Sequence, residues 1–147
     1  MRSDRLNDNS GSYDNANVKL LAISAPSGSF VDGSGASGTL ATGMTLPVGA
    51  LVLFSFIDVT TAFSGDSSCV LLIGDGSDAD RFNASSDPSI FAAGNILGGE
   101  PQGVKWCSAA TSITLTATGG SDWGAVNTAG DMTVYLIYVD PTVSVSI

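Results

Sequence analysis

Histidine is absent from the 147 residues of this chain, and basic residues are scarce. Without an imidazole, the Ser/His/Asp and Cys/His catalytic triads and the usual catalytic zinc sites cannot form. Five lysines and arginines stand against 14 acidic residues, which gives a net charge of −9 and a surface that repels a phosphate backbone. We therefore expect no nucleic-acid partner and no enzyme: no catalytic residue, no cofactor and no metal is assigned.

Long apolar runs are also lacking. The longest, Ala50–Ile57, is interrupted by Ser55 and falls short of the ~18 to 20 apolar residues that span a bilayer. The stretch Met1–Asn17 has no apolar segment of the kind a signal peptide carries. We expect a soluble chain with no membrane partner and no export by that route.

Charge is sparse as well, since 13% of the residues are charged, 44% are hydrophobic, and Glu100 is the single glutamate. The centres of protein interfaces are depleted in lysine and glutamate. This composition predicts a subunit that is covered on several sides by copies of itself or by a larger assembly. Serine- and threonine-rich β-proteins in general offer a second explanation, and the sequence leaves it open.

The length fits one compact domain. Residues 1–17 are polar, rich in Asn, Asp and Ser, and read as a flexible or docking N-terminal arm, in which Arg2 and Arg5 could bind an acidic neighbour. Residues 18–147 are expected to form a single β-sandwich domain.

Short apolar runs separated by Gly, Ser, Asp and Pro predict an all-β fold of about eight strands. The candidate strands are Val18–Ser24, Gly28–Val31, Gly38–Thr42, Leu51–Thr60, Ser68–Ile73, Val104–Ser108, Thr111–Thr118 and Met132–Val139. No convincing helix is found. A segment with Trp123 and Val126 between two turns is expected to pack across one end of the sheets. The pattern indicates an antiparallel two-sheet sandwich of jelly-roll or immunoglobulin-like topology.

Three of these runs indicate which strand faces are exposed to solvent. Thr111–Thr118 alternates, with apolar residues on one face and threonine on the other, as a half-exposed antiparallel strand does. Leu51–Ile57 and Val134–Val139 are apolar on both faces. Each of these two is either a central strand or a strand whose outer face meets another subunit.

The segment after Ile73 offers three carboxylates, Asp75, Asp78 and Asp80, and calcium prefers such oxygen clusters. The spacing does not match an EF-hand loop, because position 5 counted from Asp78 is Phe82. A solvated loop, in which aspartates cap backbone N–H groups and Arg81 balances one of them, is favoured. Whether the three carboxylates hold a cation stays open.

Cys69 and Cys107 both lie in apolar strand contexts. A disulfide would need their Cα atoms within about 7 Å, and buried free thiols are favoured. Asn83 begins an Asn-Ala-Ser glycosylation sequon. The run Gly65–Ser68 is similar to the surroundings of a serine nucleophile but has no base.

Four aromatic residues could form a sugar-binding platform, or they could be core or interface anchors, which is the reading we favour. They are Trp106, Trp123, Tyr135 and Tyr138.

Four segments together resemble the small virion proteins of tailed bacteriophages, notably the head decoration proteins. They are Leu46–Ala50, Asp58–Phe63, Leu71–Phe82 and Thr128–Val139, and the match covers roughly Leu46–Val139. The resemblance implies a β-sandwich subunit, often a homotrimer, on the outer surface of the capsid, where it binds the major capsid protein and staples neighbouring capsomers. Head fibre, tail and adaptor proteins are also small and β-rich.

The predicted function is therefore that of a capsid decoration or cement subunit, located in the virion, that stabilises the shell. The alternative is a carbohydrate- or receptor-binding β-module, associated with a head fibre or tail, that uses Trp106 or Trp123.

Overall fold

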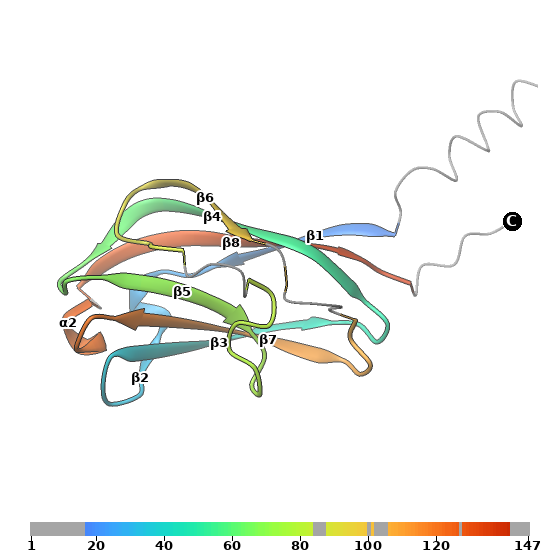
Figure 1. Ribbon diagram of the computed structural model, residues 1–147, viewed down its shortest axis with the longest axis horizontal. Helices are drawn as coiled ribbons and strands as arrows, with labels where there is room; N and C mark the ends of the chain where they lie inside the picture. The colour runs from blue at the N-terminus through green and yellow to red at the C-terminus, as the bar shows by residue number, and fades with distance from the viewer. Residues whose placement is uncertain (1–16, 84–87, 100, 102–105, 127, 142–147) are drawn as a thin grey trace, which may run out of the picture.

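The computed structural model describes residues 17–83, 88–99, 101, 106–126 and 128–141 of the chain. Two four-stranded antiparallel sheets face one another, and a short helix closes one end (Figure 1). The elements in chain order are β1 (Val18–Ser24), the 3-10 turn η1 (Ser27–Ser29), β2 (Val31–Asp32), β3 (Ser37–Leu46), β4 (Leu51–Ser64), β5 (Cys69–Gly74), β6 (Gly94–Gly99), β7 (Thr111–Gly119), α2 (Trp123–Val126) and β8 (Ala129–Val139). The predicted all-β two-sheet sandwich of about eight strands is confirmed.

Alternation along the strands builds the core between the sheets. On β7, Ile113, Leu115 and Ala117 are buried, while the intervening threonines lie on the outer face. The apolar inward positions of the other strands meet them there, and they include the large buried side chains of Ile57 and Leu136. Burial of such side chains contributes ~1.5 to 3 kcal/mol each, which makes this layer the main source of stability.

The strand orders are β1-β8-β4-β6 in one sheet and β2-β3-β7-β5 in the other. The two strands that are apolar on both faces, β4 and β8, are the central pair of the first sheet. This agrees with the interpretation of their sequences as central strands.

The pairing of strands is nested from the ends of the chain inward. The first strand, β1, pairs with the last, β8, while β3 pairs with β7 and β4 with β6. The innermost pair consists of β5 and the short segment 88–90, which forms a bridge between Val70 and Ser89. Two backbone bonds flank that bridge, from Leu71 N–H to the Pro88 carbonyl at 3.0 Å and from Ile90 N–H to the Cys69 carbonyl at 2.9 Å.

Two predicted strands differ from the structure, and one strand of the structure was not predicted. Gly28–Val31 is not one strand, because the chain first makes the 3-10 turn η1 and then the two-residue strand β2. Val104–Ser108 is not a strand in its described part, where Trp106 makes a single bridge to Leu51. The glycine-rich β6 was not expected, since only Ile96 and Leu97 in it are large and apolar.

The segment with Trp123 and Val126 forms α2, a single helical turn that the sequence did not predict as a helix. Both side chains are buried, and the turn covers one end of the sandwich as expected (Figure 1). No helix among the described residues is long and apolar enough to cross a membrane. Residues 1–16 of the predicted arm lie outside the described residues.

Candidate functional site

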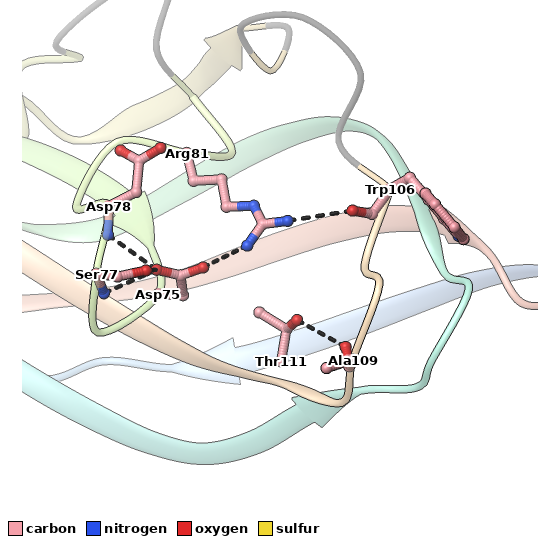
Figure 2. Close-up of polar contacts among 7 residues, drawn as sticks. All are labelled: Asp75, Ser77, Asp78, Arg81, Trp106, Ala109 and Thr111. Carbon is pink, nitrogen blue, oxygen red and sulfur yellow. Dashed lines mark hydrogen bonds and ion pairs between the residues drawn. The ribbon is translucent and has the colours of Figure 1, made fainter.

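The acidic segment after β5 folds as a compact turn around one carboxylate (Figure 2). Oδ1 of Asp75 accepts hydrogen bonds from the Ser77 N–H at 2.8 Å, the Ser77 hydroxyl at 2.7 Å and the Asp78 N–H at 2.9 Å. This is the arrangement by which an aspartate replaces backbone partners in a turn. The predicted role of aspartate as a cap for backbone N–H groups is confirmed for Asp75.

Arg81 neutralises the same carboxylate. Its guanidinium lies 2.5 Å from Oδ2 of Asp75 and also donates to the Trp106 carbonyl at 3.2 Å (Figure 2). Burial alone would raise the pKa of Asp75, but the hydrogen bonds from Ser77, Arg81 and Asp78 outweigh it and hold that pKa well below its usual range. Arg81 thus connects the turn to the segment around Trp106, through an ion pair on one side and a hydrogen bond on the other.

The other two carboxylates of the segment do not join this turn. Asp78 is exposed and Asp80 is half-buried. Within the part of the chain that the structure describes, no group of three or more His, Cys, Asp or Glu side chains could hold a metal ion. The three aspartates are therefore close in sequence, but their carboxylates do not converge on one point in space.

Directly after this turn, Asn83 covers the part of the outer edge of β5 that lies beyond the bridge to segment 88–90. It is fully buried, its Oδ1 accepts from the Ile73 N–H at 2.8 Å, and its Nδ2 donates to the Leu71 carbonyl at 2.8 Å. Phe82 N–H binds the Ile73 carbonyl at 2.8 Å in addition. A side chain thus replaces a neighbouring strand, which protects an edge that would otherwise pair with other chains. The sequon asparagine is inaccessible in the folded protein.

Asp66 lies in Gly65–Ser68, the run that is similar to the surroundings of a serine nucleophile. Its role in the structure is to hold two loops together. Its carboxylate accepts from the backbone N–H groups of Ser67 at 2.6 Å, Ser121 at 2.7 Å and Asp122 at 3.1 Å. Hydrogen bonds from Asp122, Ser67 and Ser121 hold the pKa of Asp66 well below its usual range. The carboxylate joins the loop after β4 to the loop before α2.

Both cysteines are buried free thiols and no disulfide links them, as the sequence favoured. Burial, with a smaller contribution from the charge of Asp66, raises the pKa of Cys69 to about 12. A thiol in this state is neither a nucleophile nor a metal ligand at neutral pH.

The four aromatic residues do not form one platform. Trp123 is fully buried, and its ring lies 5.2 Å from Phe30 and 6.4 Å from Phe63 between centroids. It is therefore a core residue, in line with the favoured interpretation, and the alternative role in sugar binding is wrong for Trp123. Tyr138 also packs against the core. Trp106, which is 57% exposed, and Tyr135 remain on the surface.

These two surface aromatics belong to a larger apolar surface on the outer side of the first sheet. Residues opposite one another on antiparallel strands project to the same side, and the register aligns three apolar rows across the sheet. The rows are Val18, Val139, Leu51 and Trp106; then Leu20, Ile137 and Phe54; then Ala22, Tyr135, Phe56 and Leu97. We call these three rows the apolar face.

The apolar face has a sharp border. The next row of the sheet is Ser24, Thr133, Asp58 and Asn95, which is entirely polar. Within the face, Phe56 stacks on Tyr135 with 4.5 Å between centroids, and Leu53, Phe54 and Leu97 line a groove of about 230 Å³. The apolar runs of β4 and β8 can be recognised in the sequence. That Leu20 and Leu97 lie on the same surface cannot, because only the strand register brings these residues together.

The chain matches no protein-family model and no curated protein sequence. Among solved structures it is similar to a chain of the cyanophage Pam1 capsid asymmetric unit, with a TM-score of 0.52 and 20% identity over 85% of this chain and 86% of that one. It also aligns with a chain of the acidic stable capsid structure of Helicobacter pylori bacteriophage KHP30, with a TM-score of 0.47 and 13% identity over 86% of this chain and 96% of that one. The first similarity shows that the fold of this chain also occurs in a phage capsid structure.

Proposed function

We propose that the chain is a structural protein of a bacteriophage virion, a decoration or cement subunit that binds the outer surface of the capsid and stabilises it. The observation that carries the proposal is the fold shared with the cyanophage Pam1 chain over 85% of this chain. The resemblance of Leu46–Val139 to head decoration proteins supports the finer assignment. The proposal assigns no catalytic residue and no cofactor.

The nested strand pairing describes the same fold in more detail, and from it we infer a jelly roll. In an immunoglobulin-like sandwich the first strand pairs with the second in the order ABED. Here β1 pairs with β8, and each later pair lies inside the previous one down to the Val70–Ser89 bridge. Such a ribbon of paired strands, folded over into two sheets, is a jelly roll, the architecture of many viral capsid domains and also of lectins.

Electrostatics supports a position outside the shell. A chain of net charge −9 is repelled by packaged nucleic acid and gains nothing from an inner surface. A subunit that binds the assembled major capsid protein better than loose capsid protein stabilises the shell by mass action. As a homotrimer at a threefold lattice position, it would present three copies of one binding patch and gain avidity from weak single contacts.

The test is to incubate the purified chain with assembled shells of the encoding virus that have been stripped of it. We expect it to sediment with the shells, to saturate at a fixed ratio, and to raise their melting temperature, whereas loose capsid protein should bind it less. A variant that lacks residues 1–17 should bind more weakly if the N-terminal arm is an anchor. Failure of the full chain to sediment with assembled shells would refute the proposed function.

One observation favours a carbohydrate-binding module as a second candidate, namely the exposed indole of Trp106. Figure 2 shows its backbone carbonyl bound by Arg81 while the ring points away from that contact. If sugar is the ligand, Trp106→Ala should abolish binding on a glycan array, and Val31→Ala, at an exposed residue of the other sheet, should leave it intact.

A further inference from the structure

The apolar face lies at the upper end of what an ordinary monomer exposes as one apolar patch. Among its residues and the adjacent Leu53, seven large side chains are more than a third exposed, from 38% for Leu51 and Phe54 to 77% for Leu97. With ~150 Å² for a fully exposed large side chain, the lower end of the range for aromatic residues, these fractions amount to roughly 500 Å². The largest apolar patch of a typical monomer is ~300 to 600 Å². One partner's share of a standard interface is ~800 Å², of which ~56 to 65% is apolar, so the exposed part of the apolar face matches the apolar share of a complete contact.

The opposite side of the molecule shows that this is not a general property of the fold. The outer face of β7 carries Thr114, Thr116 and Thr118, and Thr39 lies beside Thr116 on β3. That sheet covers the core equally well with hydroxyl groups over the middle of its outer face, and the apolar residues on that side, Val31, Val70 and Leu72, are fewer and are not aromatic. The leucines and aromatic residues of the apolar face therefore serve a contact and not the sandwich itself.

Charge restricts what can cover this face. Its three rows contain no Asp, Glu, Lys or Arg, and the first carboxylate, Asp58, lies in the polar row beyond. Two copies of a chain with net charge −9 repel one another, but this repulsion is screened beyond a Debye length of about 8 to 10 Å. A surface free of acids therefore allows copies of this chain to meet at close range.

We propose that the apolar face is the contact between copies of this chain. Three such faces can meet around a threefold axis, which covers them before the subunit reaches a shell and leaves the remaining surface for capsid binding. Leu97 and Trp106 are among the most exposed large side chains of the face, at 77% and 57%, and are therefore the ones that most need to be covered in a contact. The inference rests on the proposed function only for the number of copies.

The experiment compares two variants that add the same charge at equally exposed apolar residues on edge strands. Leu97→Glu lies in the apolar face, and Val31→Glu lies on β2 of the other sheet, where Val31 is 69% exposed. Molar mass is measured by analytical ultracentrifugation from low to high micromolar concentration. We expect the wild type and Val31→Glu to be oligomers, and Leu97→Glu to be a folded monomer or to associate at least ten-fold more weakly.

Leu20→Glu, at the other edge of the same face, provides a second variant and should behave like Leu97→Glu. Circular dichroism establishes that each variant is folded. A wild type that is monomeric throughout, or wild-type association in both Leu97→Glu and Leu20→Glu, overturns the inference.

Shell binding separates this inference from the proposed function. If Leu97→Glu remains an oligomer but no longer sediments with shells, the apolar face binds the capsid and the inference is wrong, while the proposed function stands. If deletion of residues 1–16 abolishes association and Leu97→Glu does not, the N-terminal arm joins the copies and the inference is again wrong. If the wild type associates through the apolar face but never binds shells, the inference stands and the proposed function fails.

Discussion

A single-atom change at Asn83 tests the account of the β5 edge. In Asn83→Asp the Nδ2 donor to the Leu71 carbonyl becomes an oxygen, while the acceptor for the Ile73 N–H is kept. An ionised carboxylate would place its charge against that carbonyl in a fully buried site. A protonated carboxyl can make both hydrogen bonds, so the folded variant is expected to take up a proton and the pKa of the new carboxyl to rise.

The size of the effect follows from that proton. The unfolded chain releases it above pH ~3.9, and holding it in the folded state costs ~1.4 kcal/mol for each further pH unit. The folded state then binds more protons than the unfolded state, so stability falls as pH rises. Relative to the wild type, Asn83→Asp should lose almost nothing near pH 4 and up to about 4 kcal/mol at pH 7. For a chain of this size the latter is roughly 8 to 16 °C in melting temperature.

The assay is urea unfolding of both proteins between about pH 4 and pH 7 at one protein concentration. Ser112→Asp is the control, because Ser112 is exposed on β7 opposite the uncharged Thr45 and the substitution adds a carboxylate at the surface. The reasoning fails if the stability difference of Asn83→Asp does not change with pH, or if it stays within ~0.5 kcal/mol of the control at neutral pH.

Three further predictions concern the core, the loops and the thiols. A Cβ at Gly38 would lie 2.3 Å from the Trp123 ring, so Gly38→Ala should cost ~1 to 3 kcal/mol in thermal unfolding, and Gly28→Ala, in open space, should not. Because the pKa of Asp66 is lowered, its stabilising effect is present above the ordinary value of 3.8 and is lost as pH falls below it. Asp66→Asn should therefore show a smaller drop in melting temperature on acidification than wild type or Asp131→Asn does. A thiol reagent should find two reactive cysteines in denaturant and none in the native protein at pH ~8, and a reactive native thiol would contradict their burial.

The sequence predicted the fold class and the strands that alternate or run continuously apolar, but not the short elements or the pairing. Val18–Ser24 coincides with β1, and Thr111–Thr118 differs from β7 by one residue, because apolar residues alternate or run continuously there. β6 has the sequence Gly-Asn-Ile-Leu-Gly-Gly, which lacks a period, and it becomes a strand because β4 offers it an edge. α2 has four residues, too few for a helical pattern.

The candidate site was accessible from the sequence only where its contacts are local. The role of Asp75 and its pairing with Arg81 follow from residues close together in the chain. Trp106 and Trp123 have the same side chain, yet one is 57% exposed and the other is buried, and only the tertiary structure separates them. The apolar face depends in the same way on a register that joins distant segments of the chain.

The pairing of β1 with β8 also has a consequence for synthesis of the chain. Val18 meets its partner Val139 only after almost the whole sandwich has left the ribosome, which at ~5 to 20 residues per second means a wait of the order of 5 to 25 seconds. During that time the apolar residues of β1, such as Leu20 and Leu21, have no partner strand to pair with. Nascent copies on neighbouring ribosomes therefore risk exchanging this first strand, and slow closure of the longest-range contact is where misassembly would begin.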